Sequence, residues 1–298
     1  MNIWVKRKSG RAGARLYRNR VALECTVIGV FCSFLRLFIR LQPTGLWSSC
    51  DIKMSGSNQH IALVTGGSRG IGRAIALALA NSGIGVAVNY RERAEEAASV
   101  VEAIHRNGGS AVASAADVSV AGSVQSMIAT IEAQLGPIDI LVNNAGIAIT
   151  RGLDDITEDD FDRTIAVNLK SAFLCTQAVL PHMRARRWGR IINISSIGAR
   201  IGARSSSVAY GAAKAGMEGL TRAYALRLGP EGVTVNAIAP GLIDTEMGKP
   251  LIEAGVAAHI PVGRVGTGDD IAQTVLLLVQ NDFITGQTLA VNGGSLFS

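Results

Sequence analysis

The sequence predicts a doubly wound α/β domain, in which a parallel sheet of about seven strands carries helices on both faces. From Ile61 onward, short apolar runs alternate with longer segments of helical period. Parallel strands need a crossover connection, so this alternation places helices on both faces of the sheet. In addition, 48% of the residues are hydrophobic and 34 are Gly, which suits buried strands and tight turns.

The expected elements follow one another at regular spacing. The first three strands are expected at 61–65, 86–90 and 111–115, and the helices after them at 73–81, 94–106 and 124–135. Three more strands are expected at 138–143, 191–195 and 233–239, with helices at about 157–187 and 208–229 between them. A last helix at 269–280 and a strand at 288–291 close the sheet.

One long stretch, residues 241–268, shows no clear period and follows the end of a strand. Open α/β sheets bind their ligands beyond the carboxyl ends of the strands. We therefore expect this stretch to form a lid over the substrate.

The catalytic domain is expected to span residues 54–298, and residues 1–53 form a basic extension outside the fold. The chain has a net charge of +6, but the extension holds ten Lys or Arg against two acidic residues. From Met54 onward the chain has 19 basic and 21 acidic residues, so its net charge is close to zero. The charge therefore gives no support to nucleic-acid binding by the domain.

The four cysteines imply no disulfide framework, because three of them lie in the extension. Cys175 is the remaining one and falls in an apolar helical stretch without a motif around it. We expect a buried structural thiol there rather than a nucleophile.

The extension is apolar over residues 21–41, but Glu24, Arg36 and Arg40 interrupt it. Its uninterrupted core of about eleven residues is short of the roughly 20 that span a bilayer. Three interpretations stay open: a leader upstream of a start at Met54, a basic targeting segment, and a membrane-associated helix. The start at Met54 is favoured, and we expect a cytoplasmic protein without stable membrane insertion.

A glycine-rich turn follows the first strand directly, where residues 65–72 read TGGSRGIG and open a helix. Glycines at 66, 70 and 72 allow a tight turn, close approach of phosphates and close packing of the helix. The helix N-terminus favours negative charge. A glycine cluster is often only a turn, but the strand before it and the helix after it predict a Rossmann-fold dinucleotide site.

The spacing Thr-Gly-x-x-x-Gly-x-Gly resembles that of the short-chain dehydrogenase/reductase family, and further family motifs follow in order over roughly residues 58–296. They are Asp117-Val118, Asn143-Asn144-Ala145-Gly146, Ser196, Tyr210-x-x-x-Lys214 and Pro240-Gly241. Taken alone, Asp117 fits a helix N-terminus and Asn143-Asn144 fits a turn. The ordered set is better explained by one active site.

The resemblance implies a cofactor site built along these motifs. Asp117 and Val118 would contact the adenine, and Pro240-Gly241 would lie beside the nicotinamide amide. The expected cofactor-binding residues are Thr65, Gly66, Ser68, Arg69, Gly70, Ile71, Gly72, Asn89, Arg91, Asp117, Val118, Asn144, Ala145, Gly146, Tyr210, Lys214, Pro240, Gly241, Ile243 and Thr245.

NADP is favoured over NAD as the cofactor. NAD enzymes usually carry an acidic residue at the end of the second strand, and here Asn89 and Tyr90 occupy that region. Arg69 and Arg91 offer bidentate donors to a 2′-phosphate. The alternative is a solvated charged face made of Arg91, Glu92, Arg93, Glu95 and Glu96.

Reduction of a ketone requires a hydride on carbon and a proton on oxygen, and a free tyrosine with a pKa near 10 exchanges its proton poorly at neutral pH. Lys214 lies one helical turn from Tyr210 and is expected to lower the pKa of Tyr210 by favouring the phenolate. Tyr210 is therefore the expected general acid for reduction and general base for oxidation. The resemblance implies that Lys214 also binds the nicotinamide ribose.

Ser196 is expected to donate a hydrogen bond to the substrate oxygen, with its neighbour Ser195 as a rival. The family's serine precedes the tyrosine by about thirteen residues and Ser196 by fourteen, which suggests one inserted residue in 203–207. Asn168 matches the asparagine that holds a proton-relay water in the family. The four histidines share no metal-ligand spacing, so no metal is expected.

These residues predict an NADPH-dependent reductase of ketones, resembling the bacterial 3-oxoacyl-(acyl-carrier-protein) reductases. An NAD-dependent sugar, polyol or steroid dehydrogenase is the alternative within the fold. A cofactor-binding regulator without turnover is the alternative from another class, which normally lacks the tyrosine or the lysine. The helices at about 157–187 and 208–229 resemble the family's dimer-forming pair, so a homodimer or homotetramer is expected.

The expected substrate is a small carbonyl compound or a thioester of a small carrier. Reductases of this kind dock the acidic carrier protein on two basic residues, and counting from shared motifs places Asp155 and Glu231 at those positions. Three arginines in neighbouring segments are possible substitutes: Arg151, Arg200 and Arg204.

Overall fold

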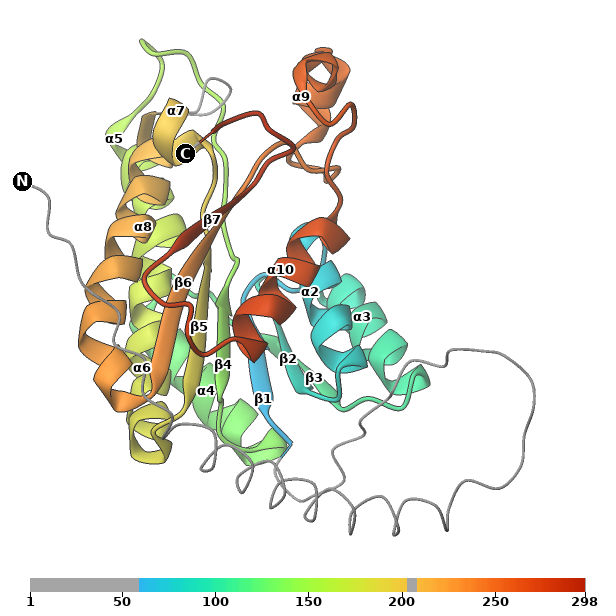
Figure 1. Ribbon diagram of the computed structural model, residues 1–298, viewed down its shortest axis with the longest axis vertical. Coiled ribbons are helices and arrows are strands. Elements are labelled where there is room, and N and C mark those ends of the chain that lie inside the picture. Colours follow the sequence, from blue (N-terminus) through green and yellow to red (C-terminus); the bar gives the residue numbers. More distant parts are fainter. Residues whose placement is uncertain (1–58, 203–207, 298) are drawn as a thin grey trace, which may run out of the picture. The chain divides into compact units, whose positions relative to one another are not determined.

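Seven parallel strands form the central sheet in the computed structural model, which describes residues 59–202 and 208–297 (Figure 1). They are β1 (Ile61–Val64), β2 (Gly85–Tyr90), β3 (Ala111–Ala115), β4 (Ile140–Asn143), β5 (Gly189–Ile194), β6 (Val233–Pro240) and β7 (Thr288–Val291). Their order is β3-β2-β1-β4-β5-β6-β7, and every neighbouring pair is parallel. The predicted sheet is confirmed.

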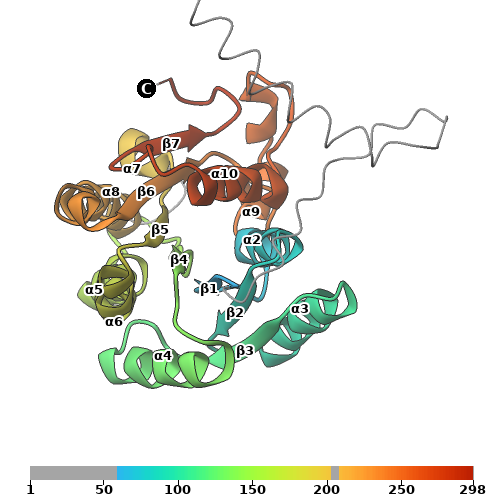
Figure 2. The same ribbon diagram turned by 60° about the horizontal axis from the view of Figure 1, so that its bottom comes forward.

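Helices cover both faces of this sheet (Figure 2). One face carries α2 (Gly70–Asn81), α3 (Ala94–Arg106) and α10 (Gly268–Gln280), and the other carries α4 (Ala121–Leu135), α6 (Ser171–Arg186) and α8 (Val208–Leu228). Successive strand side chains point to opposite faces, so Leu63 lies in one core and Val64 in the other. Cys175 is fully buried on α6, and burial raises the pKa of its thiol to about 12.

The direction of winding reverses between β1 and β4. From β1 the chain builds outward to β2 and β3, and it then returns to form β4 on the other side of β1. Loops at the carboxyl ends of β1 and β4 therefore diverge to opposite faces and leave a crevice, which is where doubly wound sheets bind nucleotides.

Five short elements differ from the sequence-based expectation. The helix expected at about 157–187 is divided into α5 (Glu158–Ile165), a π-helical turn η1 (Ala166–Lys170) and α6. The stretch 241–268 contains α9 (Lys249–Glu253) and the 3-10 turn η3 (Val256–His259), and α7 (Gly198–Ile201) follows β5. Apart from α6, each of these elements is only one or two turns long, too short for hydrophobic periodicity to reveal.

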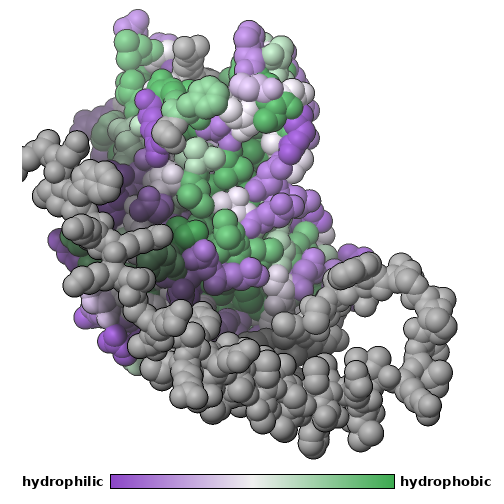
Figure 3. All heavy atoms as spheres, viewed as in Figure 1, coloured by the Kyte–Doolittle hydropathy of each residue, from purple (hydrophilic) through white to green (hydrophobic). Residues whose placement is uncertain are grey.

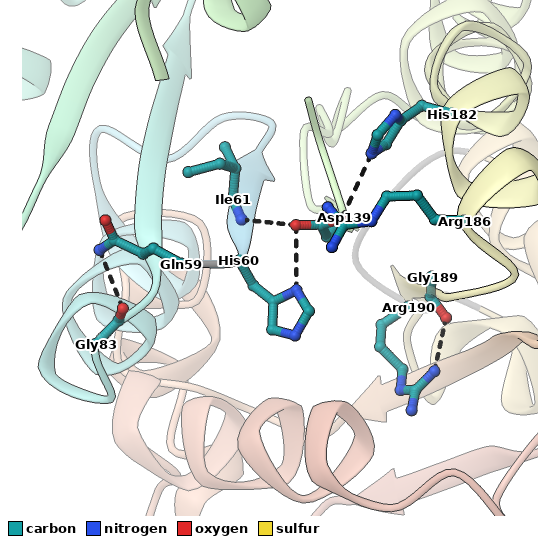
Figure 4. Close-up of polar contacts among 9 residues, drawn as sticks. All are labelled: Gln59, His60, Ile61, Gly83, Asp139, His182, Arg186, Gly189 and Arg190. Atoms are coloured by element: carbon teal, nitrogen blue, oxygen red, sulfur yellow. Dashed lines mark hydrogen bonds and ion pairs between the residues drawn. The ribbon is translucent and has the colours of Figure 1, made fainter. Parts of the chain in front are cut away.

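The amino end of β4 carries a buried carboxylate, that of Asp139 (Figure 4). Its Oδ2 accepts a hydrogen bond from the Ile61 N–H at 3.2 Å and lies 3.1 Å from Nδ1 of His60. Its Oδ1 lies 3.1 Å from Nη1 of Arg186 and 3.6 Å from Nε2 of His182. This carboxylate therefore ties the start of β1 to the end of α6, on the side of the sheet away from the crevice.

The interpretations of the extension and the inserted residue expected in 203–207 lie outside the described residues. Among the residues that the structure does describe, no helix is both long and apolar enough to cross a membrane.

Candidate active site

The glycine-rich turn between β1 and α2 is shaped by backbone conformation and close contact. Gly66 and Gly70 have φ of 61° and 52°, in the left-handed region that favours glycine. A Cβ at Gly72 would collide with the Gly66 carbonyl oxygen and would lie 2.5 Å from Nδ2 of Asn144. The turn and the N-terminus of α2 thus form a cradle that fits a pyrophosphate.

Asn144 and Thr65 hold this cradle against the turn after β4. Nδ2 of Asn144 donates to the carbonyl oxygens of Thr65 at 2.9 Å and of Gly66 at 3.0 Å. Oγ1 of Thr65 accepts from the N–H groups of Asn144 at 2.9 Å and of Ala145 at 3.0 Å. The expected cofactor-facing turns of β1 and β4 are therefore fixed to each other by side-chain amide and hydroxyl contacts.

Asn89 supports the glycine turn from behind. Its side chain is 2% exposed, and Oδ1 accepts from the Gly66 N–H at 3.1 Å. Nδ2 donates to the carbonyl oxygens of Ser114 and Ala116, each at 3.2 Å. Both ends of this amide are therefore bonded inside the fold, and the role of Asn89 in cofactor binding stays a prediction.

Asp117 lies just past the carboxyl end of β3, where the adenine contact is expected. Burial alone would raise the pKa of its carboxyl group, but hydrogen bonds from the hydroxyl and N–H of Ser119, at 2.6 and 2.9 Å to Oδ1, give a lowered pKa. Val118 is 5% exposed and belongs to a hydrophobic core, and Ser68 is buried beside the glycine turn.

The segment after β6 runs back to the glycine turn. The Gly241 N–H donates to the Val291 carbonyl oxygen at 2.9 Å, which fixes the turn after Pro240. Ile243 is buried and forms an isolated bridge with Gly266. A Cβ built on Gly70 would lie 3.3 Å from Cγ2 of Thr245, so Thr245 covers the start of α2.

Ser196, Tyr210 and Lys214 come together beyond the carboxyl end of β5. The Ser196 side chain lies close enough to the Tyr210 hydroxyl to lower its pKa, against the larger effect of burial. Lys214 is 3% exposed, and its Nζ donates to the Ile194 carbonyl oxygen at 2.7 Å and lies 5.8 Å from the centroid of the Tyr210 ring. The three side chains expected to be catalytic therefore lie in one place.

The structure distinguishes Ser196 from its neighbour. Ser195 is 3% exposed, and its hydroxyl bonds to the Lys214 carbonyl oxygen at 3.2 Å and to Oε1 of Glu218 at 3.3 Å. Its hydroxyl is thus used within the fold, whereas the Ser196 hydroxyl accepts from the Gly198 N–H at 3.0 Å and acts to lower the pKa of Tyr210. This geometry favours Ser196 as the residue available to a substrate oxygen.

Burial controls the charge of the Tyr210 and Lys214 pair. It lowers the pKa of Lys214 to about 8. It also raises the pKa of Tyr210, and the effect of Ser196 only partly offsets this rise. The lowering of the Tyr210 pKa by Lys214 stays a prediction, and Nζ of Lys214 donates to the Ile194 carbonyl oxygen in this structure. A tyrosine is protonated at neutral pH even at its ordinary pKa, and a higher pKa makes it a weaker acid, so burial by itself opposes the proton transfer.

Asn168 is fully buried in the π-helical turn η1. Its Oδ1 accepts from the Ile147 N–H at 2.7 Å, and its Nδ2 donates to the Ile147 carbonyl oxygen at 2.8 Å. A Cβ at Gly146 would lie 2.9 Å from Oδ1 of Asn168 and 3.6 Å from Nζ of Lys214. Asn168 therefore positions the segment after the Asn-Asn-Ala-Gly turn beside the lysine, with one hydrogen bond at each end of its amide.

Sequence reasoning did not assign Arg93 or Glu246 to the cofactor site. Nη1 of Arg69 and Nη2 of Arg93 both contact Oε2 of Glu246, the latter at 3.3 Å. Arg91, which was expected to join Arg69, instead pairs with Glu92. Glu246 is 153 residues away from Arg93 along the chain, so no local pattern relates the two.

Comparison with known proteins identifies the family. Residues 66–295 match the family model described as enoyl-(acyl carrier protein) reductase. The chain is 44% identical over 238 residues to the 3-oxoacyl-(acyl-carrier-protein) reductase FabG of Staphylococcus aureus strain Mu50, which covers 78% of this chain and 96% of that protein. It is 43% identical over 244 residues to the 3-oxoacyl-(acyl-carrier-protein) reductase of Synechocystis, covering 81% and 98%.

A relative named for a different thioester also matches. The hydroxy(phenyl)methylsuccinyl-CoA dehydrogenase subunit BbsD of Thauera aromatica is 42% identical over 249 residues, covering 82% of this chain and 99% of that one. A crystal structure from Agrobacterium tumefaciens, assigned provisionally as a gluconate dehydrogenase, superimposes with a TM-score of 0.75 at 35% identity and covers 80% and 97% of the two chains. The chain is therefore an oxidoreductase that belongs to the short-chain dehydrogenase/reductase family.

Proposed function

We propose that the protein reduces the 3-oxo group of acyl thioesters, or of small ketones, with NADPH. The observation that carries the proposal is the grouping of Ser196, Tyr210 and Lys214 beyond the carboxyl end of β5, where Nζ of Lys214 lies 5.8 Å from the centroid of the Tyr210 ring and Ser196 is close enough to act on the pKa of Tyr210. A regulator without turnover would not need a protonated tyrosine and a buried lysine in this arrangement.

The residues divide the chemistry between them. Bound NADPH would supply the hydride. The Ser196 hydroxyl donates a hydrogen bond to the carbonyl oxygen and stabilises the negative charge that develops there. The Tyr210 hydroxyl, which is protonated at neutral pH, transfers its proton to that oxygen. Lys214 stands beside the tyrosine and offers its ammonium to the ribose hydroxyls of the cofactor.

The charge of Asp155, in the loop after β4, favours a small carrier over an acidic carrier protein. Glu231, the other residue expected at the entrance, ends the 3-10 turn η2 (Gly229–Glu231) at the amino end of β6, away from the active site, and pairs there with Arg184. The expectation that Glu231 lies beside the entrance is therefore wrong. Of the arginines that were possible substitutes, Arg151 pairs with Asp160 at 2.7 Å and Arg200 contacts Glu218 at 3.5 Å, while residue 204 lies outside the described residues. A relative that is 42% identical is named for a coenzyme A thioester, which agrees with a small thiol carrier.

We further propose that the protein assembles as a homodimer or homotetramer. Phe161 on α5 and Phe173 on α6 are both 43% exposed, and they lie on the helices that resemble the family's dimer-forming pair. On another face, apolar residues gather around β7 and the C-terminal segment (Figure 3), where Phe283 is 97% and Phe297 85% exposed. Exposed aromatic side chains on two faces are typical of surfaces covered by other subunits.

The test is an activity screen of the purified full chain. NADPH oxidation would be followed with 3-oxoacyl thioesters of coenzyme A, the same acyl groups on carrier protein, and simple ketones. Gluconate and polyols would be offered with NAD and with NADP in the oxidative direction. We expect the thioesters of coenzyme A to give the highest kcat/KM with NADPH. Turnover confined to gluconate or polyols with NAD would overturn the proposal.

A further inference from the structure

Three segments that are far apart in the sequence meet at one carboxylate in the cofactor crevice. Arg69 precedes α2, Arg93 precedes α3, and Glu246 lies in the segment after β6. A single oxygen of Glu246, Oε2, contacts a guanidinium nitrogen of each arginine. Two guanidinium groups that converge on one oxygen form an anion site, and in this structure an internal carboxylate occupies it.

The position of this anion site matches that of a 2′-phosphate. Arg69 belongs to the glycine turn that fits the pyrophosphate, and Arg93 lies three residues past the end of β2, where the adenosine ribose binds in this fold. Asn89 is buried beneath the turn, so no carboxylate at the end of β2 competes for ribose hydroxyls. Glu246 reaches both arginines from the segment after β6, while Nη1 of Arg93 also pairs with Oε1 of Glu96 at 3.0 Å.

The Glu246 side chain can leave the arginines without moving its backbone. The Asp244 N–H donates to the Gly266 carbonyl oxygen at 2.8 Å, and the Gly248 N–H donates to the Thr245 carbonyl oxygen at 3.0 Å. These bonds hold the segment on both sides of Glu246. The side chains of Arg69, Arg93 and Glu246 are 49%, 44% and 61% exposed, so water screens their attraction and a phosphate of higher charge can replace the carboxylate.

We propose that Glu246 is an internal counter-ion which the 2′-phosphate of NADPH displaces from Arg69 and Arg93, and which thereby sets how strongly the protein prefers NADPH over NADH. This inference rests on the proposed use of NADPH. It also assigns Arg93, rather than Arg91, as the second arginine of the phosphate site. Arg91 pairs with Glu92 and acts on the Asp117 carboxylate, on the adenine side.

Equilibrium binding of two nucleotide fragments tests the inference without turnover. Adenosine 2′,5′-bisphosphate carries the 2′-phosphate, and 5′-AMP is the same molecule without it. We expect Glu246→Gln to tighten binding of the bisphosphate by about three- to tenfold and to leave 5′-AMP unchanged, because only the bisphosphate competes with the carboxylate. Glu253→Gln, which removes another exposed carboxylate of the same segment, is the matched control and should change neither affinity.

Replacing the arginines is expected to weaken binding of the bisphosphate instead of tightening it. Arg93→Ala is expected to weaken the bisphosphate at least about tenfold, and more than Arg91→Ala does, with little effect on 5′-AMP. Calorimetric titration of each variant measures all of these affinities directly.

The titrations separate failure of the counter-ion role of Glu246 from failure of the proposed use of NADPH. Equal affinity of the wild-type protein for the two fragments would contradict the proposed use of NADPH. A wild-type preference for the bisphosphate that Glu246→Gln leaves unchanged would keep that proposal and overturn the counter-ion role of Glu246. A larger loss for Arg91→Ala than for Arg93→Ala would overturn the assignment of Arg93.

Discussion

Asn168 and Ile147 are joined by two hydrogen bonds between one side-chain amide and one residue's backbone, at 2.7 and 2.8 Å. Through this pair the π-helical turn η1 holds the chain directly after Gly146, a residue that has no room for a Cβ beside Asn168. π-Helical turns inside helices occur often at functional sites. Here the turn places a buried amide where it can fix the wall of the crevice next to Lys214.

Replacing Asn168 with Asp tests this role. The substitution sets a carboxylate oxygen against the Ile147 carbonyl oxygen, and a buried group left without its partner costs about 1–3 kcal/mol. We expect Asn168→Asp to lose about 2 kcal/mol of unfolding free energy, measured by urea denaturation. The loss should grow as the pH rises, because burial raises the pKa of the new carboxyl group and deprotonation then disfavours the folded state. Asn107→Asp, at an exposed helix end, is the control, and an equal loss there would contradict the assignment.

Lys214 should make stability depend on pH in the alkaline range. Its pKa is about 8 in the folded protein against 10.5 in the unfolded chain. The folded state therefore binds fewer protons between these values, and the contribution of this group to stability rises from about pH 8 to about pH 10.5. The pKa difference corresponds to about 3 kcal/mol.

Lys214→Met is the variant that isolates this effect. We expect wild-type stability, measured relative to Lys214→Met by denaturant unfolding, to increase by about 2–3 kcal/mol between pH 7 and 10. Parallel pH profiles for the two proteins would show that burial does not depress the pKa of Lys214.

Asp139 should contribute to stability and not to chemistry. Its carboxylate is 1% exposed and contacts His60, Arg186 and the Ile61 N–H (Figure 4). Breaking a buried ion pair by removing one partner costs about 3–5 kcal/mol. Asp139→Asn keeps part of the hydrogen bonding, so we expect a loss of about 2–4 kcal/mol and an unchanged kcat at low temperature.

Asp154→Asn, which changes an exposed aspartate in a turn, is the control for Asp139→Asn and should leave the melting temperature unchanged. The same melting temperature for both variants would contradict the role of Asp139.

The choice of acyl carrier follows from the charges at the entrance. The acidic Asp155, in the loop after β4, would repel an acidic carrier protein, and this repulsion grows as salt is removed. For one acyl chain, we expect kcat/KM on a small thiol to equal or exceed that on carrier protein at low and moderate salt. A preference for carrier protein above about tenfold, equivalent to about 1.4 kcal/mol, that fades with salt would contradict this expectation.

The chain beginning at Met54 is expected to fold and assemble as the full chain does. The strands and their order depend on residues from Ile61 onward, and Asp139 fixes the start of β1 through Ile61 and His60. Light scattering and activity assays of the two proteins would check this. A monomeric or inactive truncated protein would mean that the extension contributes to the fold.

The sheet could be predicted from the sequence because the period of apolar residues is strong in buried strands. The bounds predicted for α3, β3 and β7 agree with the structure at 94–106, 111–115 and 288–291. The first turn of α2 was missed because Gly70 and Gly72 give no helical period, and η1 was missed because a π-turn inside a helix leaves the apolar pattern nearly intact.

The sequence predicted where the motifs of the candidate site lie, but it predicted fewer of the contacts that their side chains make. The sequence placed Ser196, Tyr210 and Lys214 correctly on their elements. It did not reveal that Asn89 lies behind the turn, because the direction of a strand side chain near the strand end depends on register. Nor did it reveal Glu246, whose contacts depend on how the segment after β6 folds back.

The central claim is that the Tyr210 hydroxyl delivers the proton in an NADPH-dependent reduction. The measurement that tests it most directly is the rate of NADPH oxidation by Tyr210→Phe with a 3-oxoacyl thioester, together with NADPH binding by fluorescence titration. The substitution removes the transferable proton and keeps the ring, so we predict NADPH affinity within about twofold of wild type and a kcat reduced by about 10²-fold or more. A variant that binds NADPH normally and keeps more than about a tenth of the wild-type kcat would contradict the claim.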